Sequence, residues 1–201
     1  MNIKKVVVIG GGVLGSQIAF QSAYCGYDVT IWLRSEGSIG RTQPKIDTLK
    51  QTYLDTIEIM STDEGKTKEH WAMGISDLED FDKEKCIEKT NKAYESIKLE
   101  LDLKVALQNA DIVIESMAEN VEQKIDIYKK MADFLPTHTL LVTNSSTLLP
   151  SKFAKYTKRS DKYLSLHFAN SIWKNNMTEV MGQKQTSQDS FDAVMEFAKS
   201  I

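Results

Sequence analysis

The 201-residue sequence contains only two cysteines, which limits the chemistry that sulfur can bring to it. Cys25 and Cys86 lie far apart along the chain, and neither belongs to a Cys-x-x-Cys or Cys/His cluster. Paired or clustered cysteines are the usual signature of disulfide frameworks and zinc sites. We therefore expect two reduced, packed thiols and no metal site.

Long hydrophobic runs and an excess of one charge are also lacking. The apolar stretch before Gly10 covers only four residues, too few for a signal peptide core or a membrane span. This predicts a cytoplasmic protein with no membrane partner. The net charge is −3 with both signs interspersed, which offers no electrostatic basis for binding nucleic acid.

A glycine-rich motif follows that apolar stretch directly and leads into a segment of helical periodicity. In such a G-x-G-x-x-G, Gly10 permits a tight turn, Gly12 lets a pyrophosphate approach the backbone, and Gly15 lets the helix pack close to the strand. The helix N-terminus then faces the phosphates. The residues predicted to contact a dinucleotide here are Gly10, Gly12, Val13, Leu14 and Gly15.

Apolar runs then alternate with segments of helical periodicity along the chain. Strands are predicted at residues 28–33, 111–115, 139–143 and 162–168, and helices at residues 103–109, 121–134 and 189–201. Two further helical patterns predict a helical hairpin inserted at about residues 36–97, after the second strand. We therefore expect an α/β fold in one dinucleotide-binding domain over residues 1–201: a Rossmann-type, doubly wound, mostly parallel sheet.

Polar segments follow three of the predicted strands. They are residues 115–120 (ESMAEN), 143–148 (TNSSTL) and 166–170 (LHFAN). In open parallel sheets, ligands bind outside the carboxyl ends of the strands. These segments are therefore the first candidates for a functional site.

The sequence of these segments resembles the 3-hydroxyacyl-CoA dehydrogenase family, in particular its 3-hydroxybutyryl-CoA dehydrogenase-like members. The resemblance runs from the glycine loop to the end of the chain, with least support in the helical insert. Its specific parts are residues 110–120, the Asn-x-Ser-x-Leu that begins at Asn144, and the His-Phe-x-Asn of residues 167–170. Glu179 follows His167 by twelve residues, as the family's glutamate does.

The resemblance implies an oxidoreductase of fatty acid metabolism that interconverts a 3-hydroxyacyl-CoA and a 3-oxoacyl-CoA by hydride transfer with NAD or NADP. It implies that His167 is the general base, a role that suits imidazole because its ordinary pKa of about 6.5 lies near working pH. Glu179 would orient the ring and stabilise the imidazolium. Ser146 would hydrogen-bond the substrate oxygen.

Other positions carry family roles in cofactor binding. The resemblance places Asn144 and Asn170 near the nicotinamide and gives Glu119 and Lys124 contacts with the cofactor. Purely local roles stay open for some of these segments. Asn120 suits a helix N-cap with Glu119 beside the helix dipole, and Ser146, with Ser145 before it, can cap the segment that follows.

The end of the second predicted strand departs from the family pattern. The family places there an acidic residue that binds the adenine ribose, whereas this chain has Leu33 followed by Arg34 and Ser35. Without the carboxylate, a 2′-phosphate meets less repulsion, and Arg34 can pair with it. Because Glu36 can also reach the ribose, the choice between NAD and NADP stays open.

Two further departures concern the substrate side. Ser171 stands where the family has a proline, and Ala169 replaces an aromatic residue, which predicts an altered wall. The family also continues into a helical domain that closes the active site and forms a homodimer. We expect that domain to be absent from this chain, which would then bind dinucleotide with little or no turnover.

Two alternatives to a CoA substrate remain. One is a family relative that oxidises a free hydroxy acid or sugar acid; a CoA enzyme would instead present lysines of the insert toward the cleft. The other is a non-catalytic dinucleotide-binding module, which would have lost His167, Glu179 or Ser146. All three residues are present.

Overall fold

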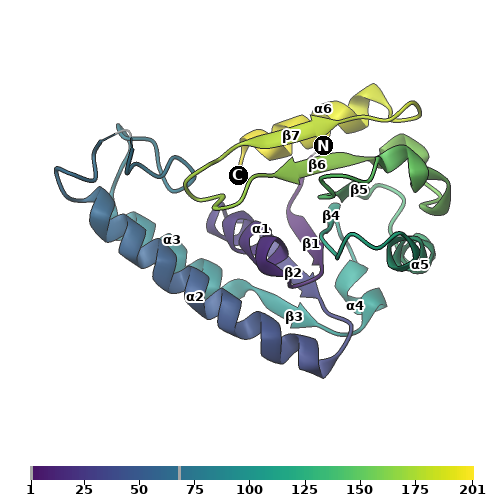
Figure 1. The fold of residues 1–201 in the computed structure, drawn as a ribbon, viewed down its shortest axis with the longest axis horizontal. Helices are drawn as coiled ribbons and strands as arrows, with labels where there is room; N and C mark the ends of the chain where they lie inside the picture. Colours follow the sequence, from purple (N-terminus) through teal and green to yellow (C-terminus); the bar gives the residue numbers. More distant parts are fainter. Residues whose placement is uncertain (1, 68) are drawn as a thin grey trace.

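The computed structural model describes residues 2–67 and 69–201 and contains one sheet with helices on both faces (Figure 1). The strands are β1 (Lys5–Ile9), β2 (Asp28–Trp32), β3 (Lys98–Glu100), β4 (Ile112–Glu115), β5 (Leu140–Thr143), β6 (Tyr163–Phe168) and β7 (Thr178–Met181). The α-helices are α1 (Val13–Tyr24), α2 (Glu36–Met60), α3 (Lys83–Ser96), α4 (Leu103–Leu107), α5 (Val121–Ala132) and α6 (Gln188–Lys199). Three short 3₁₀ turns lie between β5 and β6, at Pro150–Lys152, Ala154–Tyr156 and Ser160–Lys162.

The strands lie in the order β3-β2-β1-β4-β5-β6-β7. Every neighbouring pair is parallel except β6 and β7, which are antiparallel. The order 3-2-1-4-5-6 is that of the doubly wound dinucleotide-binding fold, and its direction reverses between β1 and β4. The predicted fold class is confirmed.

The core has one apolar cluster on each face of the sheet. Val6 and Val8 of β1 pack with α1, α2, α3 and α6, whereas Val7 and Ile9 pack with α4 and α5. Successive side chains of a strand point to opposite faces, so a strand covered on both faces is apolar throughout. This explains the uninterrupted apolar run before the glycine loop.

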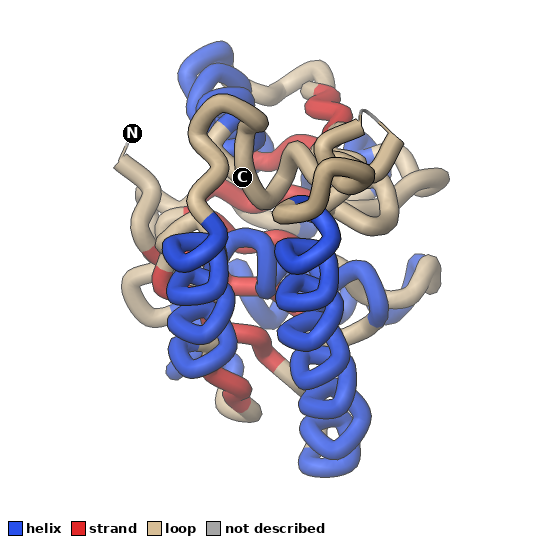
Figure 2. Tube along the Cα trace, turned by 90° about the vertical axis from the view of Figure 1, so that its left-hand side faces the viewer, coloured by secondary structure: helices blue, strands red, loops and turns tan. Residues whose placement is uncertain are grey.

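The predicted insert is a helical hairpin made of α2 and α3, which lie side by side over α1 (Figure 2). Its connecting loop reaches the segment that follows β6, because the Gly74 amide donates to the Trp173 carbonyl at 3.0 Å. Gln21 of α1 secures the same loop by donating from Nε2 to the Gly74 carbonyl at 2.7 Å. The insert therefore borders the carboxyl end of the sheet.

The two edge strands, β3 and β7, were not predicted from the sequence. β3 pairs in parallel with β2, and β7 pairs with β6, both at exposed or half-buried positions. Edge strands this short are held by backbone hydrogen bonds and bury few side chains, so they need no apolar run. Among the described residues, no helix combines the length and the apolar character that crossing a membrane requires.

Candidate functional site

The glycine loop joins β1 to α1 in a geometry that side chains would prevent. Gly10 has φ +107°, and a Cβ there would lie 2.9 Å from the Ser116 carbonyl oxygen. A Cβ on Gly15 would lie 2.2 Å from the Gly10 carbonyl oxygen. Gly12 is the N-cap of α1 and has open space around it, so the helix N-terminus is accessible to an anion. These positions fit the pyrophosphate of a dinucleotide.

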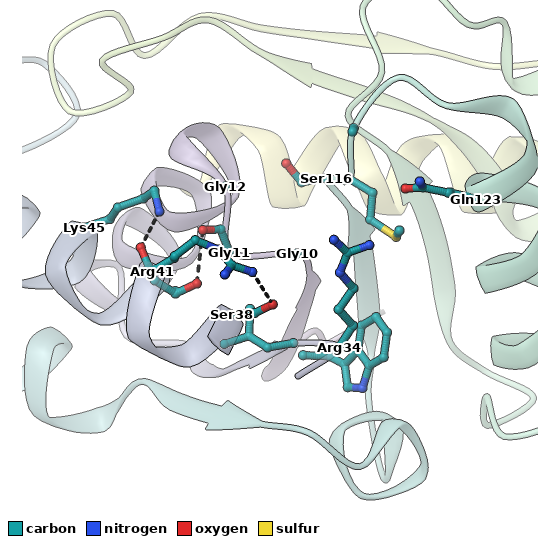
Figure 3. A pocket seen from close by; sticks show the side chains of 14 residues that line it. Gly10, Gly11, Gly12, Arg34, Ser38, Arg41, Lys45, Ser116 and Gln123 are labelled. Carbon is teal, nitrogen blue, oxygen red and sulfur yellow. Dashed lines mark hydrogen bonds between the residues drawn. The ribbon is translucent and has the colours of Figure 1, made fainter. Parts of the chain in front are cut away.

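A cavity of about 270 Å³ lies beside this loop, between the ends of β1, β2 and β4 and the start of α2 (Figure 3). Its lining includes residues 10–12, Leu33 and Arg34 at the end of β2, and residues 116–118 after β4. This is the switch point of the sheet, where doubly wound folds bind their ligands. The structure thus brings the predicted glycine loop, Leu33 and Arg34 together around this cavity. Val13, at the start of α1, is 63% exposed, and Leu14 is half-buried.

One face of α2 also lines this cavity, which the sequence analysis missed. Ser38, Arg41, Thr42 and Lys45 are spaced at i, i+3, i+4 and i+7, so they share a face of the helix. Thr42 Oγ1 donates to the Gly11 carbonyl at 3.2 Å and thereby holds this face against the glycine loop. The signal in the sequence was this polar spacing directly after the second strand.

A second, more apolar pocket of about 400 Å³ adjoins the first and shares Trp32, Arg34, Met117 and Gln123 with it. Trp32 Nε1 donates to the Leu101 carbonyl at 3.0 Å, which holds the indole in place. Ile127 of α5 also lines this pocket. An apolar slot beside the phosphate site fits a flat aromatic base such as adenine.

His167 and Glu179 meet at the other end of the sheet's carboxyl edge. They are register partners on β6 and β7, and His167 Nδ1 lies 3.2 Å from Glu179 Oε2. The side chains are 27% and 64% exposed, respectively. In a neutral ring, a carboxylate that accepts from Nδ1–H favours the tautomer with the lone pair on Nε2, which is the form that a general base needs.

The segment after β5 lies beside this pair. Asn144 Oδ1 accepts from the Phe168 amide at 3.0 Å and so joins the ends of β5 and β6. Ser145 Oγ donates to Glu119 at 2.7 Å and accepts from the Leu148 amide at 3.0 Å. Ser145 therefore has the local capping role, whereas Ser146 is exposed and only its amide contacts Glu119, at 3.3 Å.

Two predicted positions have structural partners. Asn120 is the N-cap of α5 and accepts from the Gln123 amide at 3.0 Å, as its residue type predicted. Asn170 is exposed after β6, and its carbonyl accepts from Asn175 Nδ2 at 3.1 Å.

The contact between Lys124 and a cofactor that the resemblance implies stays a prediction; in the structure this side chain is fully buried. Lys124 Nζ donates to both Glu115 oxygens, at 2.7 and 2.8 Å. Glu115 also accepts from Tyr128, Thr143 and the Met117 amide, at 2.7–2.8 Å. Burial, reinforced by the Glu115 charge, raises the pKa of Tyr128 well above its usual value, so the phenol stays a donor. Lys124 thus joins α5 to the end of β4 inside the protein.

Ser171 lies in the left-handed region, with φ +59°. Its amide donates to Gln17 Oε1 of α1 at 2.8 Å. A proline has φ near −65° and no amide hydrogen, so it cannot take this conformation or make this bond. The segment after β6 therefore follows a path that the family's proline would not permit.

The fold and the site together define a Rossmann-type dinucleotide-binding domain. The family model described as "3-hydroxyacyl-CoA dehydrogenase, NAD binding domain" matches residues 5–70 and 50–201. The chain belongs to the 3-hydroxyacyl-CoA dehydrogenase family and forms its NAD-binding domain. The described residues contain no group of three or more His, Cys, Asp or Glu side chains placed to hold a metal ion.

Several relatives match nearly the whole chain. The human mitochondrial hydroxyacyl-coenzyme A dehydrogenase is 26% identical over 99% of this chain and 57% of its own length. The 3-hydroxybutyryl-CoA dehydrogenase of Clostridioides difficile is 29% identical over 98% of this chain and 60% of its own length. A solved diketoreductase, described as catalysing reactions of dicarbonyl compounds, is 36% identical with TM-score 0.82, over 100% of this chain and 62% of its own. The chain thus spans about three fifths of the length of these relatives.

Proposed function

We propose that this chain is the cofactor-binding part of an oxidoreductase that interconverts a 3-hydroxyacyl-CoA and a 3-oxoacyl-CoA with NAD or NADP. The observation that carries the proposal is the His167–Glu179 contact of 3.2 Å at the carboxyl edge of a dinucleotide-binding sheet. The glycine loop, in which Gly10 and Gly15 leave no room for a Cβ, supports cofactor binding at the same edge.

The mechanism follows from these side chains. The bound nicotinamide supplies the hydride acceptor for oxidation of the hydroxyl carbon. His167 takes the hydroxyl proton at Nε2, and the Glu179 carboxylate stabilises the resulting imidazolium through Nδ1–H. In the reverse direction the same imidazolium returns the proton to the carbonyl oxygen.

The neighbouring polar groups position the reactants. The exposed Ser146 hydroxyl hydrogen-bonds the substrate oxygen. Asn144 Oδ1 accepts from the Phe168 amide, which leaves the Nδ2 donors of Asn144 for the nicotinamide or the substrate, and Asn170 would also contact the nicotinamide. Glu119 ties the segments after β4 and β5 together through the 2.7 Å bond from Ser145. We place a homodimer interface, where one forms, outside this chain.

A second candidate is an oxidoreductase acting on a small hydroxy or dicarbonyl compound that carries no CoA. The 36% identity to a diketoreductase favours it. Lysines of the insert also engage nearby side chains: Lys83 pairs with Glu58 at 2.6 Å, and Lys89 lies 4.3 Å from the centre of the Tyr24 ring. Lysines that already pair with a carboxylate or pack on an aromatic ring are poor candidates for binding the phosphates of coenzyme A.

The test measures oxidation of 3-hydroxybutyryl-CoA and of free 3-hydroxybutyrate with NAD⁺ and NADP⁺, and reduction of a dicarbonyl ester with the reduced cofactors. The chain is assayed together with any longer natural protein that contains it. Turnover of the CoA ester that His167→Gln abolishes supports the first proposal. Turnover of the free compounds alone supports the second. Cofactor binding without any turnover, in the longer protein as well as in this chain, contradicts both and leaves a non-catalytic module.

A further inference from the structure

We propose that Arg34, Ser38 and Arg41 form a subsite for the 2′-phosphate of NADP, so that this chain binds NADP(H) more tightly than NAD(H). This inference rests on the proposed binding of a dinucleotide at the glycine loop. It concerns which dinucleotide the chain selects, and two elements, the end of β2 and the start of α2, supply the residues.

The end of β2 is the position that meets the adenine ribose in this fold. The Leu33 amide donates to the Glu100 carbonyl of β3 at 2.8 Å, which fixes the backbone there. Leu33 is only 3% exposed and offers no acceptor for ribose hydroxyls. Arg34, the next residue, lines both the cavity at the glycine loop and the neighbouring apolar pocket. This chain therefore lacks the acceptor that selects an unmodified ribose and has the Arg34 guanidinium next to that position.

The start of α2 supplies the second half of the subsite. Arg41 Nη2 donates to Ser38 Oγ at 3.1 Å, and Ser38 Oγ lies 3.0 Å from Ser35 Oγ. Figure 3 shows Arg34 coming from the end of β2, and Arg41 and Ser38 coming from α2, toward the same cavity. Because Thr42 is bonded to the Gly11 carbonyl, this turn of the helix is held beside the site before any ligand binds.

The charges of the cavity favour an additional anion. Arg34, Arg41 and Lys45 line it, no carboxylate does, and none of the three forms an ion pair with a carboxylate in the described part of the chain. Lys45 instead donates to the Arg41 carbonyl. A pyrophosphate can be held by the α1 N-terminus, as in other folds of this type. The two guanidinium groups are then free for a dianionic phosphate, which they bind in the planar, two-pronged manner typical of arginine.

Glu36 is the residue that would oppose this assignment. It is the first residue of α2 and is exposed, but it is not among the residues that line the cavity. A carboxylate that does not line the cavity is not placed to accept from the ribose hydroxyls there. The remaining alternative is that Arg34 stacks on adenine, which would strengthen the binding of both cofactors equally.

The experiment measures dissociation constants by quenching of the intrinsic fluorescence, to which Trp32 at the cavity contributes. The ligands are NADPH and NADH, and also adenosine 2′,5′-bisphosphate and 5′-AMP, which report the subsite without the nicotinamide. The proteins are the wild type, Arg34→Gln, Arg41→Gln, the double variant, and Lys92→Gln as a control that removes one exposed positive charge of α3, outside the cavity. Circular dichroism confirms that each variant is folded.

We expect the wild type to bind NADPH and the bisphosphate about tenfold or more tightly than NADH and 5′-AMP, the size of one charge-assisted contact. Each arginine variant should lose that preference while keeping its affinity for NADH, and Lys92→Gln should change neither. An equal loss for both cofactors in Arg34→Gln, or a tenfold preference of the wild type for NADH, overturns the subsite. Failure to bind any of the dinucleotides overturns the proposed function itself, which separates the two outcomes.

Discussion

His167 and Glu179 are held together by the register of β6 and β7, so the backbone itself places an acceptor beside the ring. We expect His167→Gln and Glu179→Gln to lower kcat by about 10²–10⁴-fold, the range for losing general acid–base catalysis. The affinity for NADH should stay within twofold or so, because neither side chain lines the cavity at the glycine loop. Steady-state kinetics and fluorescence titration give the two quantities.

Glu196→Gln provides the matched control for Glu179→Gln, since it neutralises another exposed carboxylate, on α6. Its kcat should equal that of the wild type. Wild-type turnover in Glu179→Gln would remove Glu179 from the mechanism, and the 3.2 Å contact would then be a surface ion pair.

Two substitutions test the left-handed backbone conformation of Ser171 through opposite effects on stability. Ser171→Pro should lower the free energy of unfolding by about 2–4 kcal/mol, because proline cannot reach φ +59° and removes the bond to Gln17. Ser171→Gly should be neutral or slightly stabilising, since glycine adopts positive φ without strain. Urea unfolding measures both. A Ser171→Pro variant as stable as the wild type would contradict the assigned conformation.

The thiol of Cys25 makes the free energy of unfolding fall at alkaline pH. Burial raises the pKa of its thiol from 9.0 to about 11. The folded state therefore favours the neutral thiol, and this contribution, about 3 kcal/mol, is complete below pH 9 and is lost as the pH rises through 11. Unfolding in urea at pH 8.5 and 10.5 should show a smaller decline in Cys25→Ala than in the wild type. An identical decline would mean that the thiol titrates alike in both states.

At the scale of elements, the Glu115–Lys124 pair joins β4 to α5 from inside the sheet. Lys124→Met should lower the free energy of unfolding by about 3–5 kcal/mol, because it leaves the fully buried Glu115 without its cation. Lys130→Met is the matched control on the same helix: its ion pair with Asp126 at 2.8 Å is exposed, so the loss should stay below about 1 kcal/mol. Equal effects of the two substitutions in thermal or urea unfolding would contradict the structural role of the buried pair.

The same elements show what sequence patterns reveal. The buried strands β1 and β4 and the amphipathic helix α5 were predictable. A strand buried on both faces is a continuous apolar run, and a helix buried on one face has apolar residues at helical spacing. β3 and β7 leave no such record, since backbone pairing holds them. The burial of Lys124 was not predictable either: lysine is typical of the surface, and only the packing of β4 against α5 places it inside.

The candidate site divides in the same way. The glycine loop was predictable from its spacing after a buried strand, and the resemblance to the family pointed to His167 and Glu179 as a pair. Ser38 and Arg41 were not singled out, because their role depends on how the first turns of α2 lie against the loop. The hydrogen bond from Thr42 to Gly11 determines that placement, and it joins residues 31 positions apart.

At the scale of the whole molecule, the two halves of the site differ in how completely this chain builds them. The glycine loop, the end of β2 and one face of α2 enclose the cofactor cavity within the chain, whereas the reacting pair lies at the surface, with Glu179 64% exposed. Hydride transfer needs a site from which water is excluded. We therefore expect the 201-residue chain to bind its dinucleotide but to turn over 3-hydroxybutyryl-CoA at least about 10²-fold more slowly than the relatives that extend beyond it. Fluorescence titration and a coupled turnover assay on the same sample measure both. Rapid turnover that His167→Gln abolishes would show that residues 1–201 contain a complete active site. In that case, an exposed Glu179 would not prevent catalysis.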